Sequence, residues 1–186
     1  MRRGDPNSYW TTYRGKVGIR YFPRAGSSTI SEVYGRGHNF GDFLATKKKV
    51  CVVRNPWDRL MSVYNGMVRP RDKFLTYKLP KVADANDFIA WLLDQDPYDT
   101  DPHVTPMWAF LEGMWKPKPE EVYEFTDFFA NPPHGLPSTK VHLNETKYPP
   151  GGKVGVHEYW YDKWYLQLGQ RDFDLLAMAE CKKAPL

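Results

Sequence analysis

A strand followed at once by a helix, over residues 49–66, is the feature that most constrains how this chain can fold. Residues 49–53 (KVCVV) are short, apolar and mostly β-branched, as in a buried strand of a parallel sheet. After this strand, Asn55 suits the N-cap of a helix, Pro56 its first position and Asp58 its first turn. Because parallel strands are usually joined through helices, the unit predicts an α/β fold.

The predicted helix has an apolar side and a polar side, and Gly66 can end it. Asp58, Arg59 and Ser62 are expected on the polar side. Arg54 adds a guanidinium at the end of the strand, about 10 Å from the Ser62 hydroxyl at roughly 1.5 Å of rise per residue. A guanidinium and a hydroxyl on one face can hold a phosphate group. The alternative is an arginine paired with a carboxylate and a serine that is merely solvated. The expected apolar side consists of Leu60, Val63, Tyr64 and Met67.

A second unit of strand, turn and helix is predicted nearer the N-terminus. Residues 17–22 alternate weakly between apolar and polar, and residues 23–30 (PRAGSSTI) follow them. Gly26 permits a tight turn, and Glu32 has the spacing from Thr29 of a capping box. Three hydroxyl residues are each suited to the N-cap, namely Ser27, Ser28 and Thr29. A strand leading through a small turn into a helix N-terminus is typical of an anion site, although Ser/Thr clusters often do no more than begin a helix. The turn is not a Walker A sequence, because no G-x-x-x-x-G-K-[ST] occurs in the chain.

Taken together, the two turns resemble the sulfotransferases that use 3′-phosphoadenosine 5′-phosphosulfate (PAPS), most closely the branch that contains carbohydrate sulfotransferases. The likeness rests on P-R-A-G-S-S-T at residues 23–29 and R-N-P-W-D-R-L-M-S-V-Y at residues 54–64. In that family the first motif, P-K-x-G-x-[ST]-[ST], holds the 5′-phosphosulfate, and the second, R-[DN]-P-x-x-R-x-x-S-x-Y, holds the 3′-phosphate. The resemblance implies a P-loop-like parallel sheet flanked by helices, with PAPS as the donor and adenosine 3′,5′-bisphosphate as the product.

Matched position by position, the resemblance implies that Arg54 and Ser62 bind the 3′-phosphate. The implied 5′ site consists of Arg24, Ala25, Gly26, Ser27, Ser28 and Thr29. Arg24 stands where the family usually has lysine, so the charge is kept but the proton is donated far less readily. Arg24 is therefore expected to take part in catalysis by stabilising the leaving phosphate rather than by protonating it. Lys153, in the flap-like sequence PPGGK, is a further candidate contact to PAPS, and an exposed loop lysine is the alternative.

Two histidines are candidates for the catalytic base that removes the acceptor's proton. His38, in G-H-N-F-G-D-F, falls in the interval where heparan 2-O- and 6-O-sulfotransferases carry a catalytic histidine. His103, in D-P-H-V-T-P, matches a D-x-H-x-x-P element that several members of the family carry near the acceptor site. Imidazole suits this role because it titrates near neutral pH. The alternatives are a surface histidine at position 38 and, at position 103, one that only braces its loop.

Composition and charge limit the domain organisation and the kinds of partner that the chain can have. With 186 residues, 41% of them hydrophobic, the chain is expected to form an irregular arm over residues 1–14 and one domain over residues 15–186. A net charge of +4 suits an anionic ligand but lacks the dense basic clusters of a nucleic-acid binder. Cys51 and Cys181 favour neither a disulfide framework nor a metal site, so no metal is expected. No apolar stretch is long enough to span a membrane, and we expect a soluble, cytoplasmic protein.

The sequence therefore predicts transfer of a sulfuryl group from PAPS to an acceptor hydroxyl, with a glycan favoured as the acceptor. A nucleic-acid partner is not expected, and the oligomeric state stays open. One alternative is a P-loop-type nucleotide phosphotransferase, which should need magnesium and a Walker-type lysine. Another is a non-catalytic module that binds a nucleotide or single-stranded nucleic acid through its aromatic side chains.

Overall fold

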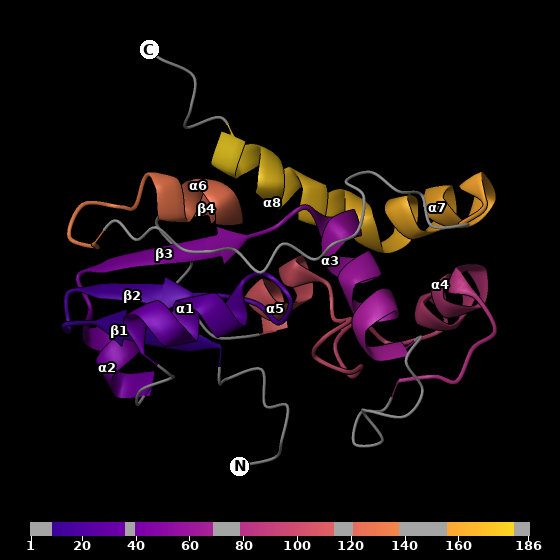
Figure 1. Ribbon diagram of the computed structural model, residues 1–186, viewed down its shortest axis with the longest axis horizontal. Coiled ribbons are helices and arrows are strands. Elements are labelled where there is room, and N and C mark those ends of the chain that lie inside the picture. The colour runs from indigo at the N-terminus through magenta and orange to yellow at the C-terminus, as the bar shows by residue number, and fades with distance from the viewer. Residues whose placement is uncertain (1–8, 36–39, 69–78, 114–120, 138–155, 181–186) are drawn as a thin grey trace.

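The structure, a computed structural model, describes residues 9–35, 40–68, 79–113, 121–137 and 156–180. The candidate residues His38 and Lys153 lie outside the described residues, as does Cys181. The described residues form an α/β domain in which helices flank a sheet of four strands (Figure 1). The predicted α/β class and the predicted flanking helices are thereby confirmed.

The sheet has the strand order β1-β2-β3-β4. Its strands are β1 (Trp10–Tyr13), β2 (Val17–Arg20), β3 (Lys48–Val53) and β4 (Glu121–Glu124). Strands β2, β3 and β4 run parallel, whereas β1 pairs antiparallel with β2. The sheet is therefore mixed, and the prediction of a wholly parallel sheet was wrong. Because β2 and β3 are parallel neighbours, the turns that follow them leave the same edge of the sheet.

Strand β1 lies within residues 1–14, so the prediction that this whole stretch is irregular was wrong. A short turn returns the chain, with Tyr13 paired to Val17 and with Arg14 and Gly15 at φ values of 50° and 65°. Aromatic residues and threonine favour strands, as in the sequence WTTY of β1. A strand of 4 residues is, however, too short to show a clear period in the sequence.

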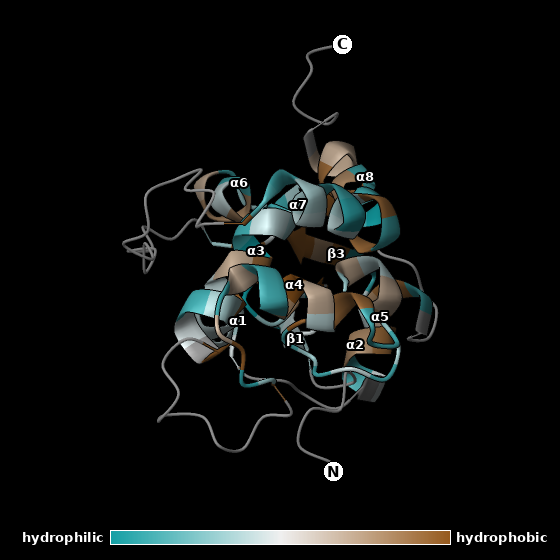
Figure 2. Ribbon diagram, turned by 90° about the vertical axis from the view of Figure 1, so that its right-hand side faces the viewer, coloured by the Kyte–Doolittle hydropathy of each residue, from teal (hydrophilic) through white to brown (hydrophobic). Residues whose placement is uncertain are grey.

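Helices cover both faces of the sheet (Figures 1 and 2). The helices are α1 (Ser27–Tyr34), α2 (Phe40–Ala45), α3 (Pro56–Val63), α4 (Ala85–Leu93), α5 (Met107–Gly113), α6 (Phe125–Ala130), α7 (Glu158–Trp164) and α8 (Gln170–Glu180). Two π-helical turns, Tyr64–Val68 and Tyr165–Gly169, continue α3 and α7. Figure 2 views the sheet from its right-hand end in Figure 1, with α1 and α6 on one side of β3 and α2, α5 and α8 on the other. None of the helices in the described ranges is both long enough and apolar enough to cross a membrane.

The side chains of β3 alternate between two hydrophobic clusters. Val50 and Val52 pack with residues of α1 and α6, whereas Cys51 and Val53 pack with residues of α2, α5 and α8. Burial of each valine side chain stabilises the fold by roughly 1.5–3 kcal/mol relative to an exposed position. Burial also raises the pKa of Cys51 to about 12, so its thiol stays protonated and unreactive at neutral pH. A continuous apolar run therefore forms the central strand, as residues 49–53 predicted.

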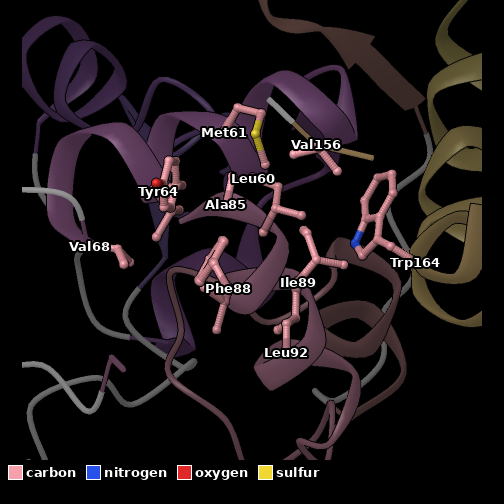
Figure 3. Close-up of a cluster of buried hydrophobic side chains, with 12 residues drawn as sticks. Leu60, Met61, Tyr64, Val68, Ala85, Phe88, Ile89, Leu92, Val156 and Trp164 are labelled. Carbon is pink, nitrogen blue, oxygen red and sulfur yellow. The ribbon is translucent and has the colours of Figure 1, made fainter. Parts of the chain in front are cut away.

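A third cluster lies beyond the ends of the parallel strands and joins α3, its π-helical turn, α4 and α7 (Figure 3). Leu60, Phe88 and Trp164 lie within it. The sequence predicted that the helix could end at Gly66. Instead, the helical backbone continues past Gly66 through the π-helical turn. Tyr64 and Val68, at the two ends of this turn, are buried in the cluster and hold it against α4.

The predicted cap of α3 is confirmed. The side chain of Asn55 accepts hydrogen bonds from the backbone N–H groups of Trp57 and Asp58 at 3.0 and 3.1 Å, and Pro56 is the first helical residue. This cap fixes where α3 begins, and hence where Arg54 lies relative to the end of β3.

Candidate anion-binding site

The turn between β2 and α1 has a strained backbone. Arg24 and Gly26 both have positive φ values, of 62° and 79°, and the N–H of Ala25 donates to the carbonyl of Phe22 at 3.0 Å. A left-handed conformation is uncommon for arginine and costs on the order of 1 kcal/mol or more. Strain of this kind is often found where a turn is built for function rather than for stability alone.

Gly26 is the N-cap of α1, and no side chain caps the helix. The prediction that Ser27, Ser28 or Thr29 caps the helix was wrong, as was the capping box with Glu32. The physical reason is that Gly26 adopts the left-handed conformation directly before Ser27, so these hydroxyl residues lie in the first helical turn instead. No side chain of the protein therefore caps their backbone N–H groups. An anion site at a helix N-terminus requires N–H groups that are left uncapped in this way.

Phe125 packs against this turn and was not expected from the sequence. A Cβ atom added at Gly26 would lie only 1.7 Å from an atom of the Phe125 ring. Phe125 is the first residue of α6, and the carboxylate of Glu124 caps that helix by accepting from Thr126 and Asp127. Glycine is thus needed at position 26 for two reasons, the backbone conformation and the ring that lies against it.

Arg54 joins the two predicted motifs directly. Its Nη1 donates to the backbone carbonyl of Arg24 at 3.2 Å. Within the described residues, Arg54 forms no salt bridge with a carboxylate. The alternative interpretation of Arg54, an arginine neutralised by an acidic side chain, therefore does not hold for these residues.

The side chain of Arg24 reaches the π-helical turn that continues α3, just beyond the second motif. A Cβ atom added at Gly66 would lie 3.3 Å from Nη2 and 3.4 Å from Nη1 of Arg24. The guanidinium of Arg24 therefore lies close to the backbone of the π-helical turn, and a glycine at position 66 provides the space. The first motif thus contacts the second motif at Arg54 and the π-helical turn that follows it at Gly66.

Arg59 is buried, although the sequence predicted that it lies on the polar side of the helix. Only 3% of the residue is exposed. Its Nε donates to the carbonyl of Pro23 at 2.9 Å, and its Nη2 donates to the carbonyl of Pro102 at 3.4 Å. Burial lowers the pKa of Arg59 to about 10, which leaves it charged at neutral pH.

Ser62 lies one helical turn after Arg59, on a neighbouring part of the same side of α3, and only 6% of it is exposed. The structure thus places both predicted phosphate ligands of the second motif on one strand–helix unit. It brings Arg54 into contact with the residue 24–29 turn, whereas Ser62 is buried within α3.

Asp172 provides a negative charge near Arg59. Its two carboxylate oxygens accept from the backbone N–H groups of Met107, at 2.9 Å, and Trp108, at 2.7 Å, at the start of α5. Burial raises the pKa of Asp172 to about 6, and the charge of Arg59 opposes that rise. Asp172 and Arg59 both line a small cavity, of about the size that holds one water molecule.

His103 lies in a tight turn shortly before α5. Nδ1 of its ring lies 2.8 Å from Oδ1 of Asp101, and the same oxygen accepts from the backbone N–H of His103 at 2.9 Å. The side chain of His103 is 19% exposed. The carboxylate orients the ring, as the bracing interpretation predicted. Because a carboxylate accepts hydrogen bonds, this contact favours the tautomer in which Nδ1 carries the proton, and a role as a base is also compatible with the geometry.

The described residues contain no group of three or more His, Cys, Asp or Glu side chains placed to hold a metal ion. The arrangement that they do form is cationic: Arg24 and Arg54 lie at two neighbouring strand ends, beside an uncapped helix N-terminus, and the buried Arg59 bonds to the carbonyl of Pro23 at the start of the same turn. Such an arrangement can bind an anion with two or more separate negative groups. Comparison of the chain with models of protein families, with curated proteins and with solved structures finds no match.

Proposed function

We propose that this protein is a PAPS-dependent sulfotransferase that moves a sulfuryl group from PAPS to an acceptor hydroxyl, with a glycan as the favoured acceptor. The observation that carries the proposal is the contact between the two motifs, in which Arg54 donates to the backbone carbonyl of Arg24. Two motifs that resemble the 5′- and 3′-phosphate sites of one family are thus held side by side. A P-loop-like arrangement of the fold is part of the same proposal.

The residues at the site fit a nucleotide with phosphate groups at two positions. The uncapped N–H groups of residues 27–29 and the guanidinium of Arg24 would hold the 5′-phosphosulfate. Arg54 and Ser62 would hold the 3′-phosphate, with Arg54 offering the fork geometry that suits phosphate oxygens. Ser62 is buried, so the groups that cover it would have to move for this contact to form.

The proposed reaction forms a bond between the acceptor oxygen and sulfur and breaks the bond between sulfur and the bridging phosphate oxygen. The electron pair of the broken bond stays on the phosphate, where Arg24 and the N–H groups of α1 stabilise the developing charge. The acceptor's proton passes to a histidine. Of the two candidates, His103 has the orienting carboxylate of Asp101 at 2.8 Å, and His38 lies outside the described residues. Transfer reactions of this kind depend mainly on positioning and electrostatic stabilisation.

Isothermal titration calorimetry with adenosine 3′,5′-bisphosphate, ATP and a short oligonucleotide tests the proposal. We expect the bisphosphate to bind more tightly than ATP, and Arg54→Ala and Ser62→Ala each to weaken its binding roughly tenfold or more, because hydrogen bonds to charged groups contribute about 1.5–3 kcal/mol. Arg14→Ala, which removes an exposed arginine in the β1–β2 turn, is the matched control and should leave binding unchanged. Equal affinity for ATP would contradict the proposal, and salt-dependent binding of the oligonucleotide alone would favour the nucleic-acid module instead.

A further inference from the structure

We infer that Arg59 is a positioning residue that holds the donor-binding turn and the loop of the candidate base in a fixed register. This inference rests on the proposed function for its catalytic meaning. Its structural content, that one buried side chain joins the two loops, can be tested without a substrate.

The geometry places both loops on a single guanidinium. Nε of Arg59 donates to the carbonyl of Pro23, and Nη2 donates to the carbonyl of Pro102. Each proline directly precedes a residue of the proposed site, Arg24 in one loop and His103 in the other. Because the guanidinium is planar and rigid, its two donors have a fixed separation and direction. A shift of either loop relative to the other would therefore break one of the two bonds.

Burial strengthens this connection, in which the bond to Pro23, at 2.9 Å, is buried and the bond to Pro102, at 3.4 Å, is partly buried. Arg59 is 3% exposed, so water cannot easily replace either carbonyl. The carboxylate of Asp172, which lines the same cavity, compensates part of its charge. Asp172 is itself fixed by the backbone of Met107 and Trp108 at the start of α5. Lysine can supply the charge at position 59 but not two donors in a rigid fork.

Arg59→Lys in the full chain tests the inference, because its effect on bisphosphate affinity can be compared with its effect on turnover. Lysine keeps the charge at position 59, and the bisphosphate contacts only one of the two joined loops, so we expect its affinity to change by less than about threefold even where the register between the loops is lost. Turnover with PAPS is expected to fall roughly a hundredfold, as for a misplacement of reacting groups by about 1 Å. Arg14→Lys is the matched control and should change neither value. Equal losses in affinity and turnover, or no loss in either, would overturn the inference.

Hydrogen exchange on the unmodified protein provides a second test that needs neither a variant nor a ligand. The backbone N–H of Ala25 bonds to Phe22 in one loop, and those of Val104 and Thr105 bond to Asp101 in the other. If Arg59 joins the loops, the amides of both loops should open together. Their free energies of opening should then be the same and should depend on low concentrations of urea in the same way. Separate openings of the two loops would overturn the inference, even where bisphosphate binding supports the proposed function. Shared opening without any bisphosphate binding would instead count against the proposed function alone.

Discussion

Arg54 donates a hydrogen bond to the backbone carbonyl of Arg24 at 3.2 Å, across 30 positions of sequence. The bond crosses between two neighbouring strand ends, because Arg24 follows β2, Arg54 follows β3, and these strands pair in parallel. A residue proposed to bind the 3′-phosphate therefore also holds the backbone of the turn proposed to bind the 5′-phosphosulfate. Loss of Arg54 should consequently affect both ends of a bound nucleotide.

Gly66→Ala should weaken ligand binding without lowering the stability of the protein. Alanine favours the helical state over glycine by roughly 0.5–1 kcal/mol, so the melting temperature should stay the same or rise slightly. The new Cβ would, however, lie 3.3–3.4 Å from the guanidinium nitrogens of Arg24 and displace them. We expect bisphosphate affinity, measured by calorimetry, to fall several-fold while the melting temperature is maintained.

Gly41→Ala, at an exposed position in α2, is the control for the effect of helix propensity. It should leave bisphosphate affinity unchanged. Unaltered affinity in Gly66→Ala would show that the position of the Arg24 guanidinium does not matter for the ligand.

Gly26→Ala should destabilise the protein strongly, and Phe125 should account for part of the effect. Alanine at a φ of 79° is strained by about 1 kcal/mol or more, and its Cβ would overlap the Phe125 ring. Replacing Phe125 with alanine removes the overlap but not the backbone strain. In urea denaturation, the double variant should therefore lose less stability than the sum of the two single losses. Additive losses would mean that the ring moves away at no cost.

The sequence predicted those parts of the fold that depend on neighbouring residues. Asn55, Pro56 and Asp58 lie side by side in the sequence, and the cap that they form is local. The apolar run of β3 and the glycine of the residue 23–26 turn are also readable without tertiary structure. Both strand–turn–helix units, which carry most of the proposed site, could be predicted for this reason.

The contacts that complete the site could not be predicted, because they join distant positions. Arg59 was expected on the polar side of the helix with Asp58 and Ser62, and its two carbonyl partners lie 36 and 43 positions away. Phe125 is likewise an ordinary aromatic residue until the fold brings it against Gly26. The only available signal for Arg59 was its fixed place in the second motif, three positions before Ser62. That signal marks a residue as important without showing what it contacts.

His103→Ala should lower turnover without loss of donor binding. If His103 is the base, its removal should reduce turnover with PAPS roughly a hundredfold or more, the loss typical of a general base. Asp101→Asn should also reduce turnover, because the amide cannot hold the charged imidazole as the carboxylate does at 2.8 Å. Bisphosphate affinity should remain within about twofold in both variants, which calorimetry can check.

His38→Ala is the necessary parallel variant, since the sequence also made His38 a candidate for the base. A loss of turnover confined to His38→Ala would exclude His103 as the base and reduce the Asp101 contact to a brace of the loop. Normal turnover in both variants would contradict the proposed mechanism even if the donor is PAPS.

Asp172 should make stability depend on pH in the direction opposite to most carboxylates. Burial raises its pKa in the folded protein to about 6, above the value of about 3.9 for an unfolded aspartate. The folded state therefore binds a proton more tightly, and the free energy of unfolding should fall as pH rises from 4 to 7. Asp172→Asn does not titrate, so the difference in stability between the parent protein and this variant isolates the effect of Asp172.

That difference should decrease by about 2 kcal/mol between pH 4 and pH 7, measured by urea denaturation at intervals of one pH unit. Asp174→Asn, an exposed position on the same helix, is the matched control and should show no such change. A difference that stays constant or increases with pH would mean that Arg59 and the two backbone N–H groups outweigh the cost of burial. In that case the carboxylate would be a net source of stability at neutral pH, and the connection from α3 through Arg59 to α5 would be stronger than inferred from burial alone.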